Sequence, residues 1–201
     1  MAAALPKAEQ SDRTRSALLN VAHGLFAERG YANTSTQDIV EGAEVTRGAL
    51  YYHFHSKKGI FQAVFERLTE ARAQTVRARI EAAKGDIWQR LVKTGCATFI
   101  ESVVDKDSQR IIFLDGPSVL DPRVWRENVQ AVDIIRRSLE QLVAEGFIED
   151  TPCDTLARLL WGSFLESGLC ISYAADAEKV QREMARGLEY LFESLRTKPK
   201  S

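Results

Sequence analysis

The sequence has few of the residues that build catalytic or metal centres. It contains three Cys and three His in 201 residues, and no CxxC pair or other metal-ligand spacing. Residues 56–201 contain no His, so that region has no imidazole for acid–base or nucleophilic chemistry. Phosphate-binding glycine motifs and a GxSxG nucleophile motif are also absent. These absences argue against an enzyme, although carboxylates and lone thiols remain.

The sequence also lacks a long apolar run and an excess of charge. Its most apolar stretch, LLWGSFLESGLCISYAA, contains Glu and Ser and is too polar to span a bilayer. The N-terminal residues lack the basic start and apolar block of a signal peptide. A net charge of −1 gives no general attraction to polyanions, so any nucleic-acid contact must come from local arrangement. We therefore expect a cytoplasmic protein with buried, reduced thiols and no membrane contact.

Helical periodicity is abundant. Apolar residues recur at spacings of three and four, and a hydrophobic content of 45% is ample for a core. We therefore predict an all-α fold of about nine helices, with DGPSVLDP (115–122) as a loop. The first eight expected helices cover approximately residues 11–29, 36–43, 46–54, 57–83, 87–104, 109–114, 123–144 and 152–174, and the ninth ends near 196.

The short helices expected at 36–43 and 46–54 are joined by a brief turn, which is the helix-turn-helix pattern. Leu50 and Phe54 lie four residues apart in the second helix, so both are expected to face inward with the apolar residues of the first helix. The opposite face then carries residues suited to a DNA major groove: Arg47, Gly48, Tyr51 and Tyr52.

These residue types fit the chemistry of a DNA groove. An Arg can reach guanine, a Gly lets the backbone approach, and Tyr can donate to phosphates while its ring touches thymine methyl groups. Thr36, expected as a helix N-cap, offers a hydroxyl and free N–H groups to a phosphate. Lys57 begins the next helix, where the dipole disfavours a cation, so an external phosphate is the expected partner. Helix-turn-helix pairs also occur in proteins that bind no DNA, and exposed Tyr also fits a protein interface.

Four motifs, AHGLFAERGY, TSTQDI, TRGALYYHF and SK, fall in register within about residues 12–66. Together they resemble the N-terminal domain of the TetR family of bacterial transcriptional regulators. The resemblance implies phosphate contacts at Thr36 and Lys57. It also implies contacts at or near the groove for Gln37, Thr46, Arg47, Gly48, Tyr51, Tyr52 and His53. Glu44 departs from the family, which often has Gly in this turn, so some turn strain is expected.

The resemblance implies two domains. Residues 1–56 form the DNA-binding domain, with the helix-turn-helix at about 35–54, and residues 57–201 form a helical bundle for ligand binding and dimerisation. The last two helices pair the subunits, and the resulting two-fold homodimer reads palindromic operator DNA. Residues that fit such a seam are Leu159, Gly162, Ser163, Glu166, Leu169 and Cys170, followed by Met184, Leu188, Leu191, Phe192 and Leu195. An ordinary buried core helix would show the same pattern.

A pocket for a small-molecule effector is expected among large side chains of the bundle, with a few polar groups. The candidate lining residues are Trp88, Cys96, Phe99, Phe113, Trp125, Trp161, Phe164 and Glu166, with Ser163 and Tyr173 as further polar candidates. The same aromatic cluster also fits a plain core. We expect no cofactor and no metal, because His53 and His55 have no further ligands nearby in the sequence.

The sequence therefore predicts a ligand-responsive transcriptional regulator, a repressor released from a palindromic operator by a small apolar or aromatic effector. Activation stays open, because nothing in the sequence fixes the sign of regulation. The alternative is a helical enzyme or a redox sensor using Cys96, Cys153 or Cys170, without effector-controlled DNA binding. A helical interaction module is a third class, and it would leave the polar aromatic surface at 46–57 unexplained.

Overall fold

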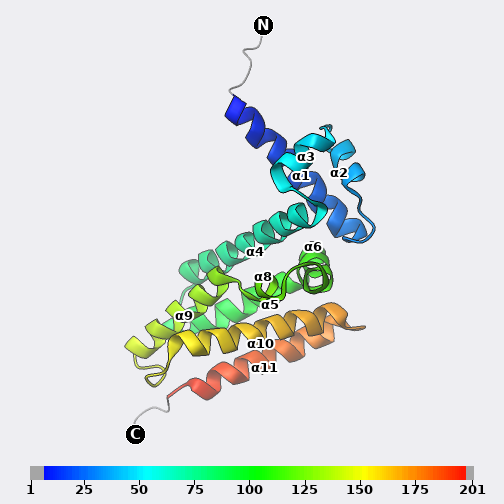
Figure 1. Ribbon diagram of the computed structural model, residues 1–201. Helices are drawn as coiled ribbons and strands as arrows, with labels where there is room; N and C mark the ends of the chain where they lie inside the picture. The colour runs from blue at the N-terminus through cyan, green and yellow to red at the C-terminus, as the bar shows by residue number, and fades with distance from the viewer. Residues whose placement is uncertain (1–6, 198–201) are drawn as a thin grey trace.

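The computed structural model describes residues 7–197, and this range is helical apart from its turns and one isolated bridge between Ile148 and Arg196. Figure 1 shows a small N-terminal group of helices seated on one end of α4 and a larger bundle beneath it. The predicted all-α class is confirmed. Along this range, no helix is long and apolar enough to cross a membrane.

The N-terminal part consists of α1 (Lys7–Arg29), α2 (Thr36–Gly42), α3 (Arg47–Phe54) and the first half of α4 (Lys57–Ala82). Fully buried side chains from all four helices meet in its core: Leu18, Phe26, Ile39, Leu50 and Phe61. Phe54 is 5% exposed, so the predicted inward face of α3 is confirmed. The core fixes which face of α3 remains open to solvent.

Capping residues determine where these helices begin. Ser35, not Thr36, caps α2: its hydroxyl accepts from the Asp38 N–H (3.1 Å), while the Asp38 carboxylate accepts from the Ser35 N–H (2.7 Å). Thr36 is therefore the first residue of α2, and the prediction of its capping role is wrong. Ser56 caps α4 as predicted, accepting from the Gly59 N–H at 2.9 Å. Helix α1 begins at Lys7, about one turn before the expected start.

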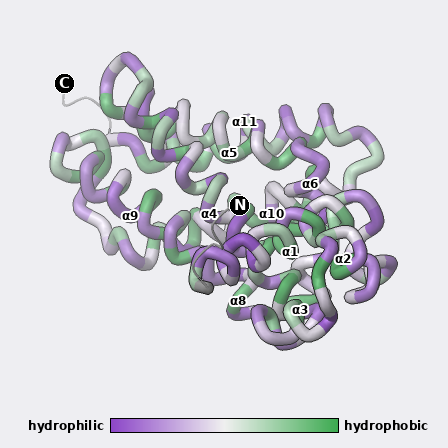
Figure 2. The backbone as a smooth tube through the Cα atoms, turned by 90° about the horizontal axis from the view of Figure 1, so that it is seen from above, coloured by the Kyte–Doolittle hydropathy of each residue, from purple (hydrophilic) through white to green (hydrophobic). Residues whose placement is uncertain are grey.

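The larger part follows α4. Its elements are η1 (Gln89–Thr94), α5 (Gly95–Val103), α6 (Lys106–Ser108), η2 (Gln109–Asp115), α7 (Gly116–Val119), α8 (Pro122–Arg126), α9 (Val129–Ala144), α10 (Cys153–Tyr173) and α11 (Ala177–Leu195), where η denotes a π-helix. Helix α10 packs between α9 and α11, as Figure 1 shows. In Figure 2 hydrophobic and hydrophilic stretches alternate along the helices, as expected when only one face of each helix is buried.

Two expected boundaries in this part are wrong. The segment 115–122 is not simply a loop, because α7 forms with Pro117 in its first turn, where a missing N–H costs nothing. The helix expected over 123–144 is interrupted between α8 and α9, where the Asn128 side chain caps α9 by accepting from the Ala131 N–H (3.0 Å). The predicted break at Gly85 is confirmed, and its φ of +114° is a conformation that favours Gly.

Candidate nucleic-acid interface and internal cavity

Helix α3 presents a polar, aromatic face to solvent. Tyr52 is 76% exposed and Tyr51 39% exposed, opposite the buried Leu50. Other predicted contact residues are also exposed: Gln37, Thr46, Arg47 and Gly48. The remaining three are half-buried: Thr36, His53 and Lys57. The nine residues thus lie along the start of α2, the outer side of α3 and the start of α4, which we call the α3 face.

Arg47 and Tyr51 contact each other across one turn of α3. An Arg47 Nη2 donates to the Tyr51 hydroxyl at 3.5 Å, and the guanidinium carbon lies 5.6 Å from the centre of the Tyr51 ring. The hydrogen bond from Arg47, followed by one from Thr36, lowers the pKa of Tyr51. The contact aligns the Arg47 side chain along α3 and leaves most of its five N–H donors open to an external acceptor.

Two residues next to α3 adopt left-handed backbone conformations. Glu44, in the turn between α2 and α3, has a φ of +53°, and His55, directly after α3, has a φ of +64°. This conformation costs a residue with a side chain about 1–2 kcal/mol. The strain expected at Glu44 is therefore present. Gly59 permits the tight turn that follows, since a Cβ there would collide with the Phe54 carbonyl oxygen.

Lys57 has partners within the fold. Its Nζ donates to the carbonyl oxygens of Tyr31 and Thr34, both at 2.9 Å, and lies 4.2 Å from the centre of the Tyr31 ring. The prediction that an external anion explains this cation better than fold stability is therefore wrong. The turn after α1 supplies acceptors that the sequence does not reveal. An ammonium group has three N–H donors, so a phosphate contact through the third stays a prediction.

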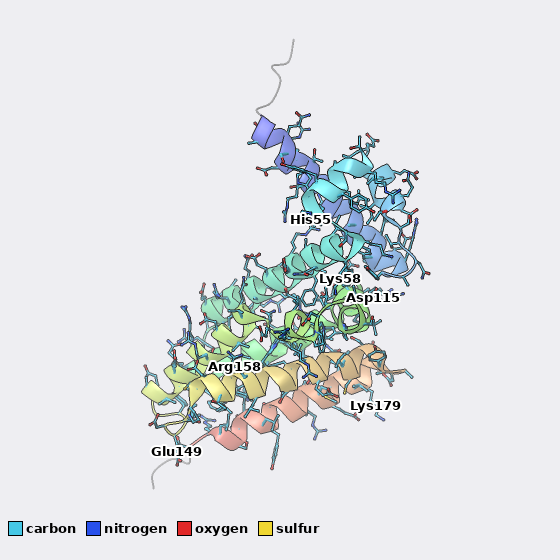
Figure 3. All side chains as sticks on the ribbon, in the orientation of Figure 1. His55, Lys58, Asp115, Glu149, Arg158 and Lys179 are labelled. Atoms are coloured by element: carbon cyan, nitrogen blue, oxygen red, sulfur yellow. The ribbon has the colours of Figure 1, made fainter. Side chains whose placement is uncertain are left out.

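Helix α1 and the turn after it also join the N-terminal part to the bundle. The Tyr31 N–H donates to Asp115 Oδ2 at 2.8 Å, and His23 Nε2 lies 3.1 Å from Asp107 Oδ2. Asp115 lies at the end of η2 on the bundle side of this junction, as Figure 3 shows. Sequence reasoning missed both carboxylates, because nothing local distinguishes them from surface acids. They connect the N-terminal part to α6 and η2 of the bundle.

The bundle contains a mainly apolar cavity of about 90 Å³, lined by residues of α4, η1, α5, η2, α8, α9, α10 and α11. Six of the eight predicted pocket residues line it: Cys96, Phe99, Phe113, Trp125, Trp161 and Phe164. Trp88 and Glu166 do not. Trp88 packs on Phe147 and donates to Glu193 (3.1 Å), while Glu166 is exposed on α10 beside Cys170. The further polar candidates Ser163 and Tyr173 lie outside the lining as well.

The two indole N–H groups of the cavity wall already have partners. Trp125 Nε1 donates to the Ile112 carbonyl and Trp161 Nε1 to the Arg126 carbonyl, both at 2.8 Å. Sequence reasoning missed the most polar lining residue, Arg72 of α4. Helix α4 carries several Arg, and their spacing looks like an ordinary solvated helix face. Only the packing of α4 against α5 and η2 singles out this one.

A surface groove of about 640 Å³ adjoins the cavity, beside α9 and α10. Trp125, Asn128, Trp161 and Leu165 line both spaces, so they form the wall between them. The hydrogen bond from Trp161 to the Arg126 carbonyl helps to close this wall. The groove and the cavity are therefore neighbours that share these four side chains.

The thiols are poorly suited to redox chemistry. All three are half-buried rather than fully buried as expected. Burial raises the pKa of Cys96 to about 12, and burial also raises the pKa of Cys153 and Cys170. Reactive thiols need a lowered pKa, so these environments disfavour a thiol sensor. Within residues 7–197, no group of three or more His, Cys, Asp or Glu side chains is arranged to hold a metal.

The last two helices carry exposed apolar and aromatic side chains. They are Leu159 (66% exposed) and Tyr173 (68%) on α10, and Tyr190 (76%) and Leu191 (43%) on α11. Two of the expected seam residues, Leu188 and Phe192, instead point into the subunit's own core. Leu159 and Leu191 stay on the outside as predicted. We call this surface the α10–α11 face.

Two family models match the chain. The model of bacterial regulatory proteins of the tetR family matches residues 18–64, and that of the tetracyclin repressor-like C-terminal domain matches residues 88–195. The crystal structure of a TetR-family transcriptional regulator from Pectobacterium atrosepticum is 31% identical. It has a TM-score of 0.84, and the comparison covers 98% of this chain and 100% of that one.

Curated relatives match over different lengths. The HTH-type transcriptional regulator TtgR of Pseudomonas putida is 35% identical over 103 residues, which covers 51% of this chain and 49% of TtgR. The regulator CymR of Pseudomonas putida is 28% identical over 191 residues, covering 91% of both chains. The chain thus spans about half the length of the first of these relatives and most of the length of the second.

Proposed function

Because the chain belongs to the tetR family of bacterial transcriptional regulators, we propose that it binds a palindromic operator as a homodimer and responds to a small apolar or aromatic effector. Residues 1–56 act as the DNA-binding domain, with the helix-turn-helix at about 35–54, and residues 57–201 as the ligand-binding and dimerisation domain. One observation carries the proposal: the α3 face is exposed, polar and aromatic while the other side of the same short helix is buried. Fold stability alone gives no reason for that face.

In this proposal Arg47 reads a base, since Arg to guanine is the commonest specific contact in the major groove. Its neighbour Gly48 supports a close approach. A Cβ at Gly48 would have only the Thr46 hydroxyl within 4 Å, at 3.8 Å, so any side chain there would extend into the space for DNA. Tyr51, held by Arg47, and the exposed Tyr52 contact backbone or thymine methyl groups. Thr36, Gln37, Thr46, His53 and Lys57 complete the proposed contacts.

We propose that the α10–α11 face joins two subunits. Exposed Tyr and Leu side chains on two adjacent helices form a surface that a second copy would bury in a four-helix seam. Gly162 and Gly187 lie in these helices with nothing within 4 Å of a Cβ position. Gly in a helix interior costs about 1 kcal/mol relative to Ala, and here it would let a partner helix approach closely. Two-fold pairing presents two α3 helices to the two half-sites of a palindrome.

We propose that η2 couples effector binding to DNA binding. Ile112 and Phe113 of η2 line the cavity, and the same helix ends at Asp115, which accepts from the Tyr31 N–H beside α2. A cavity of about 150 Å³ is known to hold benzene, so an aromatic effector needs more room than the present 90 Å³. Enlarging the cavity would move η2 and hence the turn after α1, where the Tyr31 carbonyl accepts from Lys57 of the α3 face. The effector thus favours a form with lower operator affinity.

The proposed sign of regulation is repression. A relative from Brucella suis biovar 1, BepR, is named a transcriptional repressor and is 33% identical over 109 residues. A repressor needs only to occupy its operator and leave when the effector binds. The coupling through η2 supplies that release without a further protein contact.

Binding to the DNA upstream of the protein's own gene tests the proposal. We expect salt-sensitive binding with a clear preference over a scrambled duplex, measured by fluorescence anisotropy at two salt concentrations. A sample unfolded and refolded to remove any bound effector is compared in parallel. If neither sample prefers the upstream DNA, both are tested against a genomic library of duplexes. The regulator proposal fails if neither sample binds any duplex of that library more tightly than scrambled DNA.

A further inference from the structure

Arg72 occupies an unusual position in the cavity wall. It is the one charged residue among the cavity-lining residues that the structure describes. Its guanidinium carbon lies 5.2 Å from the centre of the Phe99 ring and 5.3 Å from that of Phe113. Nε and Nη2 both donate to the Ser102 hydroxyl, at 3.1 and 2.9 Å. Between residues 7 and 197, no carboxylate forms an ion pair with it.

This cation is incompletely compensated. A guanidinium has five N–H donors, and two of the five are used on a single hydroxyl oxygen. Burial lowers the pKa of Arg72 to about 10, and the negative charge of Asp105 opposes this only in part. Arg72 is half-buried, and among the described residues three of its five N–H donors have no hydrogen-bond partner.

The other lining residues indicate which class of ligand fits the cavity. The lining has no Asp or Glu, and its aromatic members surround an apolar space. Thr69 donates to the Phe65 carbonyl (3.1 Å), and both indole N–H groups donate to carbonyls, so these donors are already used. What the cavity offers a ligand is apolar contact, the side-chain amide of Asn128, the hydroxyl of Ser138, and Arg72 as the one cation of the described lining. An apolar molecule with one anionic group matches the apolar contact and the cation.

We propose that the effector is a small aromatic monocarboxylate, with its carboxylate on Arg72 and its ring against Phe99, Phe113 and Phe164. This inference rests on the proposed function and names the ligand class of that site. The planar fork of Arg matches a carboxylate with two parallel hydrogen bonds. A carboxylate that draws the guanidinium away from Phe113 also loosens a contact of η2, the helix that reaches Tyr31 through Asp115.

Matched acids and amides test the proposal on the wild-type protein. Benzoate is compared with benzamide, and phenylacetate with phenylacetamide, by isothermal titration without DNA. Each amide keeps the ring and removes the charge, so we expect the acids to bind about 10- to 100-fold more tightly. Below the acid's own pKa of about 4, affinity should fall as the carboxylate becomes protonated. Equal affinity for acid and amide, or no binding of either, would overturn the proposal.

Variants on α4 locate the charge. Arg72→Gln should lose the preference for acid over amide while keeping its affinity for the amide. Arg77→Gln, on the exposed side of the same helix, should keep the wild-type preference. Thermal unfolding checks that each variant folds. If Arg72→Gln does not fold, Arg72→Lys keeps the charge and should still prefer the acid. An Arg72→Gln protein that folds and retains the full preference contradicts the assignment.

The release of operator DNA separates this inference from the function on which it rests. Operator binding is measured first without any probe, and then with each acid and amide. If the protein binds its operator but the titrations show no preference for acids, the ligand class is wrong and the regulator stands. If the protein binds no operator, the regulator proposal fails, while the titrations still decide the role of Arg72.

Discussion

Replacing Gly168 by Ala should imitate an effector. Gly168 is buried in α10, and a Cβ there would collide with the Phe113 ring of η2. Overpacking of this kind typically costs about 1–3 kcal/mol. The gain in helix propensity from Gly to Ala, about 1 kcal/mol, offsets part of that cost. The free energy of unfolding should therefore fall by up to about 2 kcal/mol, which lowers Tm by at most roughly 4–8 °C for a chain of this size.

The displaced Phe113 moves η2, so operator affinity without effector should fall by roughly 5- to 150-fold, the usual range of allosteric coupling. Anisotropy titrations give the affinity, and differential scanning calorimetry gives Tm. Gly24→Ala is the matched control, because Gly24 lies on α1 with nothing within 4 Å of a Cβ position. This control should raise stability slightly and leave DNA binding unchanged. If Gly168→Ala binds the operator as well as wild type while its Tm falls, η2 does not carry the coupling.

Arg47→Ala should lose both affinity and sequence preference, whereas Lys57→Ala should weaken all sequences alike and flatten the salt dependence of anisotropy titrations. If Arg47→Ala keeps the wild-type sequence preference, α3 is not the recognition helix. Glu44→Gly should raise the free energy of unfolding by up to about 1 kcal/mol in urea titrations, because Gly adopts the left-handed conformation of residue 44 without strain. A free energy of unfolding below that of wild type would contradict strain at Glu44. Hydrogen bonds from Ser35 and Arg136 lower the pKa of Asp38 and Asp133, respectively, so their stabilisation is present above pH about 4 and is lost as the pH falls through the lowered pKa. Urea titrations from pH 6 to 2 should show that loss, and flat stability below pH 4 would contradict it.

The elements that sequence reasoning located well are those with local causes. Ser56 caps α4, and Gly85 lies in the break between α4 and η1. Both were predictable because each acts on backbone groups only a few residues away. The spacing of Leu50 and Phe54 fixed the exposed side of α3 for the same reason. Thr36 and Ser35 are both good caps. Ser35 is the cap because it lies three residues before Asp38, whose carboxylate completes the capping box.

The missed features depend on contacts between distant residues. Tyr31 and Asp115 are 84 positions apart, and no local pattern marks either one. Lys57 resembles an unpaired cation until the turn after α1 is in place around it. Trp88 has the same large apolar character as Trp125, yet only Trp125 lines the cavity, since Trp88 lies against Phe147 and Glu193.

The positions where this chain departs from folding rules lie at the proposed functional surfaces. The strained Glu44 is in the turn that leads into the α3 face, and Gly162 and Gly187 weaken the helices of the α10–α11 face. Arg72 places a charge beside an apolar cavity. Natural sequences usually agree with their fold at every level and break that agreement at functional sites. A second subunit would cover the bare helix surface at Gly162 and Gly187, and an anionic ligand would pair with Arg72.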